Sequence, residues 1–256
     1  MLTHLVAVVL GVIEGIAEFL PISSTGHLII AERLLRLTST DFLTSFDITI
    51  QLGAILAVVM LFGKRLLTSW ELLKRIVVAF IPTAVIGLVL YKIIKQLLGS
   101  PTVVLWMLGI GGVILIVFER WYDEPADAHE NLETMPYRTA ALLGVAQSVA
   151  VIPGVSRSAA TIVGGLSLGL SRRAIVEFSF LLAIPTMAAA SALDLYKSAG
   201  SFSGDQWGAL SIGFVVSWLV ALVAIRWLLQ YIRSHDFTLF GMYRVIAALV
   251  FAVLLH

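Results

Sequence analysis

Long apolar stretches separated by short polar connections dominate the chain. Residues 76–90, 103–118 and 212–225, for example, contain no charged side chain. A helix needs about 20 predominantly apolar residues to cross the hydrocarbon core of a membrane. The pattern therefore predicts six membrane-spanning helices, at about residues 47–63, 76–96, 101–118, 174–195, 208–229 and 238–256.

Two further segments, residues 2–36 and 139–171, have a different pattern. They are apolar at their ends, but their middles carry proline, serine, threonine, glycine and charged residues. Non-helical backbone is tolerated at membrane depth only where protein buries it or where it lines a cavity. We therefore predict that each segment is a re-entrant helical hairpin whose polar turn lies inside the protein.

The predicted order of one hairpin and three spans, occurring twice, indicates an internal repeat. A glycine, an acid or amide three residues later, and then a proline occur in both hairpins: Gly11, Glu14 and Pro21, then Gly144, Gln147 and Pro153. Three crossings per half would place the second half upside down, as in the inverted repeats of many transporters. We expect one membrane domain over residues 1–256, with halves at about 1–120 and 137–256 joined by a polar loop at about 119–138. Chance similarity between two apolar sequences is the alternative.

Composition supports a membrane protein and excludes several other classes. Hydrophobic residues make up 59% of the chain and charged residues 13%, whereas soluble domains are nearer one half and one quarter. The net charge is +1 and no basic block occurs, so nothing indicates nucleic-acid binding. Cysteine is absent, which excludes disulfides and thiol chemistry. The predicted fold class is an all-α polytopic membrane protein.

The first hairpin carries two carboxylates, Glu14 and Glu18, which lie four residues apart and therefore share one helix face. At low dielectric both stay ionised only beside a cation, and otherwise one takes up a proton. Ionisable groups inside a membrane segment usually mark a functional site. The pair is suited to bind a divalent cation through oxygen, or one member acts as a general base. A structural pair neutralised by a neighbouring arginine is the alternative.

A cluster of hydroxyl groups follows Pro21, which ends the first helix. The helix N-terminus after it is a ready anion site, and a serine beside carboxylates can be an activated nucleophile. For a single serine, a plain helix cap is an equal interpretation. His27 is an acid, a base or only a hydrogen-bonding neighbour. The cluster consists of Ser23, Ser24, Thr25, Gly26 and His27.

The second turn also precedes a helix, and it places Arg157 at membrane depth. Arginine stays charged and binds phosphate through two parallel N–H groups. Neutralisation of Glu14 or Glu18 by Arg157 is the alternative and is compatible with function. Carboxylates, hydroxyls and an arginine together favour phosphoryl transfer, and a phosphorylated substrate that lives in a membrane is a lipid. The candidate binding residues of this turn are Gly154, Ser156, Ser158 and Thr161.

At these two turns the chain resembles the undecaprenyl-pyrophosphate phosphatases, the bacitracin-resistance family. Residues 14–27 carry a long and specific match, and residues 153–161 match the family's proline-glycine-x-serine-arginine-serine pattern. Residues 51–58 and 177–183 are similar as well, so that the resemblance covers essentially the whole chain.

The resemblance implies removal of one phosphate from undecaprenyl pyrophosphate, which recycles the lipid carrier for peptidoglycan synthesis and confers bacitracin resistance. It implies a multi-pass protein of the bacterial inner membrane, with a divalent cation, Mg²⁺ or Ca²⁺, near the two glutamates. Ser24 would be the nucleophile, with Glu14 and Glu18 as base and as metal or charge partners. Arg157 would bind the phosphates with Ser156 and Thr161. Expected partners are the polyprenyl substrate and membrane lipids but no nucleic acid, and a homodimer is left open.

Two other functions compete with the phosphatase hypothesis. Acid-phosphatase-like lipid phosphatases need a histidine about six residues after the arginine, but position 163 is valine. A transporter or flippase of the polyprenyl carrier, alone or as a second activity, would suit an inverted repeat. A carrier, however, does not need Ser24 beside paired carboxylates.

Overall fold

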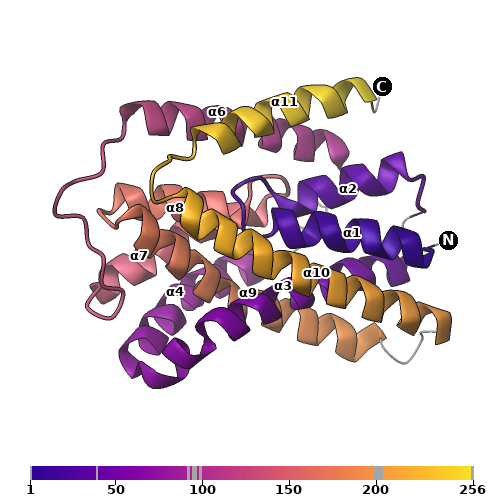
Figure 1. Ribbon diagram of the computed structural model, residues 1–256, viewed down its shortest axis with the longest axis horizontal. Helices are drawn as coiled ribbons and strands as arrows, with labels where there is room; N and C mark the ends of the chain where they lie inside the picture. The colour runs from indigo at the N-terminus through magenta and orange to yellow at the C-terminus, as the bar shows by residue number, and fades with distance from the viewer. Residues whose placement is uncertain are drawn as a thin grey trace.

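The protein is a bundle of helices, and no named strand occurs in the part of the chain that the structure describes (Figure 1). The computed structural model describes residues 2–38, 40–90, 93, 97, 100–198 and 204–254. The helices are, in chain order, α1 (His4–Ala17), α2 (Ser24–Leu34), α3 (Asp41–Thr68), α4 (Trp70–Val89), α6 (Pro101–Trp121), α7 (Tyr137–Ser148), the 3₁₀ turn η1 (Val149–Val151), α8 (Arg157–Ser167), α9 (Arg172–Ser198), α10 (Gly204–Tyr231) and α11 (Thr238–Leu254).

All six predicted spans fall on helices. Among the described residues, four helices are long and apolar enough to cross a membrane, namely α3, α4, α6 and α10. α11 is apolar but has 17 residues, whereas α9 has 27 residues and is more polar. α9 lies in the interior, where its Phe178, Phe180 and Leu182 are fully buried. The last part of the predicted span 76–96 falls on residues 91, 92 and 94–96, and the last two residues of the span 238–256 are 255 and 256; these lie outside the described residues. The prediction of an all-helical, multi-pass membrane protein is confirmed.

Hydroxyl side chains cap the starts of the long helices α3, α4 and α6. Thr40 accepts a hydrogen bond from the backbone N–H of Leu43 at 3.1 Å, and Ser100 precedes Pro101 at the first helical position. Ser69 separates α3 from α4 and caps α4 in the same way. Because each cap satisfies a backbone donor that the helix leaves unpaired, it stabilises the start by about 1 kcal/mol.

The outer faces of the long helices are apolar. Leu88, Trp106, Val113, Val223 and Leu249 are each more than half exposed. Exposed apolar side chains in such number would be costly in water, whereas lipid tails solvate them well. These faces are therefore the surface that contacts the membrane interior.

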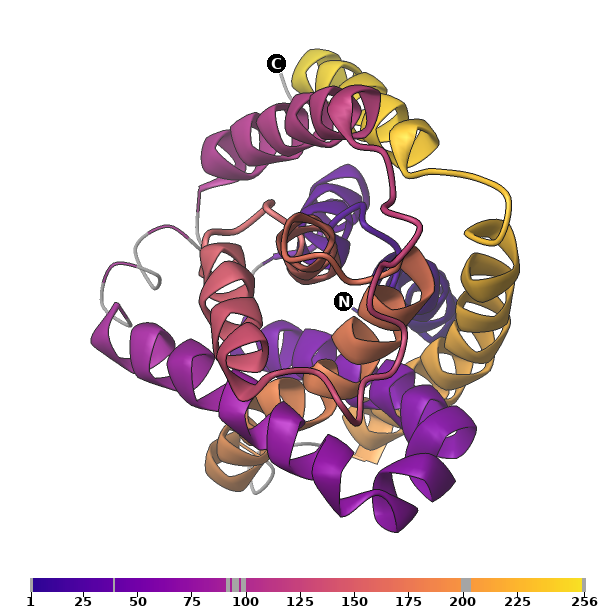
Figure 2. The same ribbon diagram turned by 90° about the vertical axis from the view of Figure 1, so that its left-hand side faces the viewer.

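Each of the two polar segments predicted to form hairpins folds into a pair of short helices. α1 and α2 are joined by residues 18–23, and α7 and α8 by residues 149–156. Helices of 11 to 14 residues are about 17–21 Å long, too short for a hydrocarbon core of about 30 Å. Seen along the long axis of the molecule, α8 lies near the centre of the bundle, whereas α7 lies at its edge beside α4 (Figure 2). Ser23 and Ser24 at the first turn and Ser156 at the second are buried. The turns are thereby placed inside protein.

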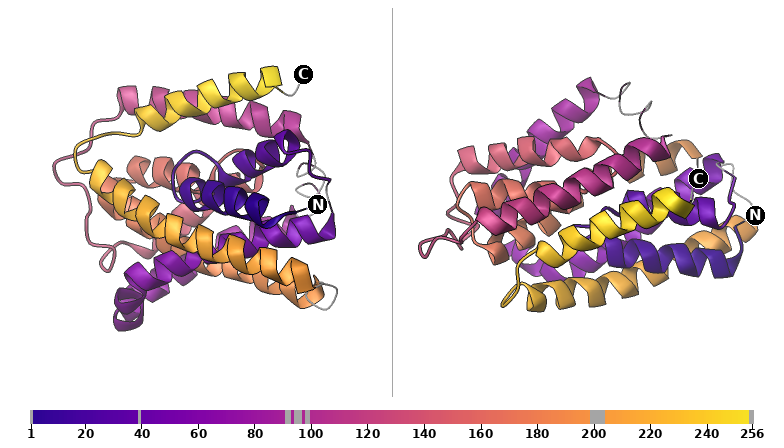
Figure 3. Two further views of the ribbon diagram at one scale, coloured as in Figure 1. Left: turned by 45° about the vertical axis from the view of Figure 1, so that its right-hand side comes forward. Right: turned by 90° about the horizontal axis from the view of Figure 1, so that it is seen from above.

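Each hairpin packs against a long helix from the other half of the chain. α1 lies along α10, and α7 lies along α4, while α3 pairs with α9 and α6 with α11 (Figure 3). Small residues at these crossings let the backbones approach closely. A Cβ on Gly11 would lie 2.8 Å from the carbonyl oxygen of Gly213, and one on Gly144 would overlap the carbonyl oxygen of Ala79.

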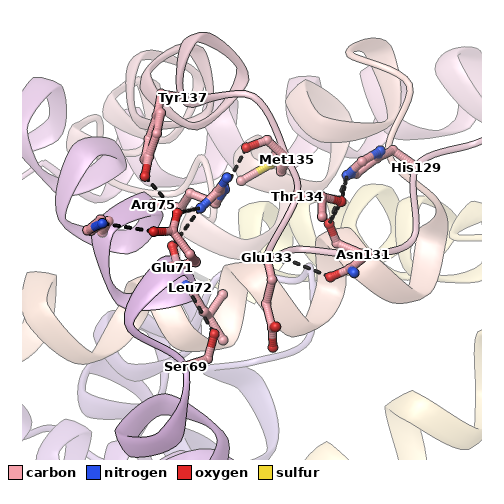
Figure 4. A network of polar contacts seen from close by, with 11 residues as sticks. Ser69, Glu71, Leu72, Arg75, His129, Asn131, Glu133, Thr134, Met135 and Tyr137 are labelled. Atoms are coloured by element: carbon pink, nitrogen blue, oxygen red, sulfur yellow. Dashed lines mark hydrogen bonds and ion pairs between the residues drawn. The ribbon is translucent and has the colours of Figure 1, made fainter.

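The connection between the halves, residues 122–136, is fastened to α4 by a polar network (Figure 4). The buried Arg75 donates to the carbonyl oxygen of Met135 at 2.5 Å and to the Glu71 carboxylate at 2.7 Å. Tyr137 donates to the same carboxylate at 2.8 Å. Within the connection, His129 bonds to the carbonyl of Asn131. This end of the bundle is therefore held together by a network separate from the two turns.

The crossing of α7 and α4 generates a prediction. Gly144→Ala should destabilise the protein by about 1–3 kcal/mol, because the added methyl group overpacks against the Ala79 carbonyl. Thermal unfolding in detergent, followed by circular dichroism, measures the change. Gly87→Ala on α4 is the matched control, since its Cβ meets no described atom within 4 Å and alanine favours a helix. A Gly144→Ala protein that unfolds at or above the temperature of Gly87→Ala would contradict the close packing.

Candidate active site

Two turns form the site, and each ends in a serine with a similar positive-φ backbone conformation. Ser23 precedes α2 with φ 73° and ψ 91°, and Ser156 precedes α8 with φ 73° and ψ 114°. Residues other than glycine rarely adopt positive φ, and each such residue costs about 1–3 kcal/mol. Such a conformation persists only where the surrounding structure holds it, and it is common at functional sites.

Glu18 accepts hydrogen bonds from residues at both turns. One of its carboxylate oxygens accepts a hydrogen bond from Ser24 Oγ at 2.6 Å, and the other accepts one from Arg157 Nη2 at 3.2 Å. A second nitrogen of Arg157, Nη1, donates to the carbonyl oxygen of Ser179 at 2.8 Å. Arg157 Nε has no partner among the described residues. Glu18, Ser24 and Arg157, drawn from both halves of the chain, therefore make one connected group.

A cavity of about 170 Å³ lies between the turns. Since a water molecule occupies about 30 Å³ in the liquid, this volume suits a phosphate group and a few waters. Both α2 and α8 begin at the cavity, so their first N–H groups favour an anion there. The lining residues are Glu18, Ser23, Ser24, Thr25, Gln51, Ala150, Ile152, Pro153, Gly154, Ser156, Arg157 and Met187.

Glu14 lies one turn before Glu18 on α1 and is fully buried. Neither of its carboxylate oxygens has a hydrogen-bond partner among the described residues. A buried charge without a partner is costly, so this carboxylate fits a cation or a proton. No group of three or more histidine, cysteine, aspartate or glutamate side chains in the described ranges is arranged to hold a metal ion. A cation here would therefore take only two carboxylates from the protein.

His27 lies away from the cavity. Its Nδ1 bonds to the carbonyl oxygen of Ser23 at 2.8 Å, and its Nε2 bonds to the hydroxyl of Tyr243 on α11 at 2.8 Å. The two rings stack with their centroids 5.5 Å apart. Because both ring nitrogens are engaged with these groups, the imidazole is placed to orient the first turn.

Three other predicted binding residues also lie outside the cavity lining. Thr161 Oγ1 donates to the carbonyl of Arg157 at 2.8 Å, within α8 itself. Ser158 is fully buried, and its hydroxyl has no partner in the described part of the chain. Gly26 leaves room for Ser23 Oγ, which would lie 3.3 Å from a Cβ at that position.

Sequence reasoning missed two contributors to the site. Gln51 of α3 lines the cavity, and its amide within the apolar run 47–63 was the available signal. The carbonyl of Ser179 on α9 holds Arg157, but no sequence pattern marks a backbone acceptor. Both groups come from helices predicted as simple spans.

These features define a multi-pass membrane protein with a phosphate-sized polar site inside its helical bundle. The chain belongs to the family of the bacitracin resistance protein BacA, whose family model matches residues 7–250. It is 52% identical to an undecaprenyl-diphosphatase of Aquifex aeolicus, with 98% of each chain covered. It is 49% identical to an undecaprenyl-diphosphatase of a Sulfurihydrogenibium species, again over 98% of each chain.

The geometry of the cavity predicts which hydroxyl positions are accessible. In this cysteine-free chain, Thr25→Cys should react with a small polar thiol reagent, because Thr25 is partly exposed and lines the cavity. Added pyrophosphate should slow that reaction. Ser158→Cys is the control and should not react in the folded protein, because Ser158 is fully buried. Equal labelling rates at the two positions would contradict the cavity's position.

Proposed function

We propose that this protein is an undecaprenyl-diphosphatase of the bacterial inner membrane, which hydrolyses undecaprenyl diphosphate to undecaprenyl phosphate and phosphate. Membership of the BacA family and the names of the relatives support the activity. The observation that carries it is the bonding of Glu18 to both Ser24 and Arg157 beside one cavity. The reaction returns the lipid carrier to envelope synthesis. An abundant enzyme of this kind confers bacitracin resistance.

The first chemical step uses the contact between Ser24 and Glu18. Ser24 Oγ attacks the terminal phosphorus while Glu18, which already accepts its hydrogen bond at 2.6 Å, takes the proton as a general base. The bond from that phosphorus to the bridging oxygen breaks. The proton then passes from Glu18 to the departing undecaprenyl phosphate, and a phosphoserine remains at Ser24.

In the second step water replaces the serine. Glu18, again a carboxylate, takes a proton from a water molecule that attacks the phosphoserine. The bond from phosphorus to Ser24 Oγ breaks, Oγ regains a proton, and inorganic phosphate leaves. Arg157 and the N-termini of α2 and α8 stabilise the negative charge in both steps, and the unpartnered Nε of Arg157 is available to bond a phosphate oxygen.

We further propose that the two halves form an inverted repeat around this site. Among the described residues, each half contains a pair of short helices followed by three longer ones, and α1 packs on α10 as α7 packs on α4. In Figure 1 the chain begins at the right-hand end, whereas the connection into α7 lies at the left. This arrangement supports hairpins that enter from opposite membrane faces and meet at their turns, as in transporters with midplane sites.

The residues present fit a divalent cation as a cofactor. The two unpartnered oxygens of the buried Glu14 lie beside Glu18 on one helix face. Mg²⁺ characteristically takes one or two carboxylates from protein and completes its shell with water and substrate phosphate oxygens. When bound, a cation would neutralise charge on the diphosphate. Glu14 would hold it, and Glu18 would supply the second carboxylate while it keeps its hydrogen bond from Arg157.

Substitution of the nucleophile Ser24 or of the phosphate-binding Arg157 tests the activity. In purified protein with Mg²⁺ or Ca²⁺, Ser24→Ala should lower phosphate release from a polyprenyl diphosphate by on the order of 10³-fold or more, because it removes the nucleophile. Arg157→Ala should lower it by on the order of 10³-fold, because it removes the phosphate clamp. Ser167→Ala, at the far end of α8, is the matched control and should keep full activity.

The outcomes separate the remaining hypotheses. A near-normal rate in Ser24→Ala would show that Ser24 is not the nucleophile and that a metal-activated water or another hydroxyl attacks instead. No phosphate release from the unaltered protein would contradict the phosphatase and leave transport of the lipid carrier as the function to test.

The cation site makes its own prediction. Titration of Mg²⁺ into chelator-treated protein should raise the thermal unfolding temperature, because a ligand that binds only the folded state stabilises it. Glu14→Gln should weaken that effect and phosphate release together, since it removes the carboxylate charge. Glu130→Gln, in the exposed connection, is the control. An unchanged Mg²⁺ response in Glu14→Gln would rule out Glu14 as a ligand.

A further inference from the structure

Arg244 is a fully buried cation in the middle of α11. Its guanidinium donates hydrogen bonds to five backbone carbonyl oxygens and to no carboxylate among the described residues. Two of the acceptors belong to α6, one to the first turn and two to the second. The bonds run from Nε to Leu108 at 3.2 Å, from Nη1 to Pro21 at 3.3 Å and Val155 at 3.0 Å, and from Nη2 to Met107 at 3.1 Å and Gly154 at 2.9 Å.

The carbonyl acceptors of Arg244 on the two turns lie next to the two serines with positive φ. Pro21 lies two residues before Ser23, and Val155 lies directly before Ser156. Ser23 and Ser156 are the two residues with positive φ that start α2 and α8. Since such backbone is strained, it must be held from outside. One planar guanidinium that bonds both turns supplies that restraint.

The surrounding helices leave space for the Arg244 side chain. A Cβ on Gly111 would overlap the guanidinium, and a Cβ on Gly112 would lie 2.9 Å from Arg244 Cβ. These adjacent glycines lie in the middle of the apolar helix α6, where they would otherwise weaken the helix. The buried arginine therefore explains why Gly111 has no side chain. At Gly112 the close approach of the α11 backbone is the reason, because a Cβ there would lie 2.7 Å from the carbonyl oxygen of Gly241.

The neighbouring residue on α11 contacts the same turn. Tyr243 bonds to His27 Nε2, and His27 Nδ1 bonds to the carbonyl of Ser23. Two consecutive residues of α11 thus reach the first turn, one through a histidine and one directly. Neither residue lines the cavity, so neither is placed to touch a phosphate there.

We infer that Arg244 is a positioning residue that ties the two turns together, so that Ser24 and Glu18 of the first stay opposite Arg157 of the second. The expected effect of Arg244 on turnover rests on the proposed phosphatase activity. The inference that Arg244 holds the two turns together does not depend on that activity. Loss of the guanidinium would leave the carbonyls of Pro21, Gly154 and Val155 without these donors. A displacement of about 1 Å between reacting groups then lowers the rate by on the order of 100-fold.

Arg244→Met and Arg244→Lys test the inference against Arg75→Met. Arg75 is the matched control, because it is also a buried arginine that donates to a backbone carbonyl, that of Met135, but at the loop end of the bundle. Both methionine variants should lower the thermal unfolding temperature. Only Arg244→Met should lower kcat, by on the order of 100-fold with a much smaller change in KM. Arg244→Lys, which keeps the charge and three donors, should recover part of kcat.

A second readout does not depend on activity. Thr25→Cys and Ser156→Cys place one thiol on each turn, at positions that line the same cavity, in a chain without other cysteines. A short bifunctional thiol reagent should cross-link this pair efficiently, also with Arg75→Met present, and poorly with Arg244→Met present. If Arg244→Met does not fold, the same comparison is made with Arg244→Lys.

The inference is overturned if the folded Arg244 variants keep both kcat and cross-linking at the level of Arg75→Met. If the unaltered protein releases no phosphate, the proposed function fails, and the cross-linking yield alone then decides the role of Arg244. Loss of cross-linking in the Arg244 variants but not in Arg75→Met supports it.

Discussion

The carboxylate of Glu18 is the interaction on which the site depends. One oxygen accepts from Ser24 and the other from Arg157, so a single acid links a hydroxyl group and a cation that are more than a hundred residues apart in the chain. Buried charges are stable only when paired and hydrogen bonded. The pairing therefore joins the two turns beside the cavity that they line.

The remainder of the fold serves to keep polar backbone away from lipid. Two turns that interrupt the α-helices lie inside the bundle, and the carbonyls of Pro21, Gly154 and Val155 are satisfied by protein donors, as membrane depth requires. α11 supplies the donors from Arg244, and α9 supplies the carbonyl that orients Arg157. The same contacts at these turns therefore satisfy the buried backbone and position the reacting groups.

The sequence was sufficient to predict the helical spans and to single out Glu18, Ser24 and Arg157, because charges and hydroxyls inside apolar runs are conspicuous. It left open whether Arg157 contacts Glu14 or Glu18. It did not reveal that His27 faces Tyr243, since the rotation of α2 depends on a helix 216 residues further along the chain. Arg244 is the one charged side chain in the run 238–254, which marks it as unusual. That its partners are backbone carbonyls required coordinates, because an acceptor common to every residue leaves no pattern.

Because the acceptors of Arg244 are backbone carbonyls, substitutions on the two sides of these hydrogen bonds have different effects. The oxygens that hold Arg244 belong to the main chain, so replacing the side chains of Met107, Leu108 or Val155 leaves every acceptor in place. No other amino acid offers five N–H groups in a fixed plane. The hydrogen bonds therefore tolerate side-chain substitutions at the acceptor residues, but any substitution of Arg244 removes donors.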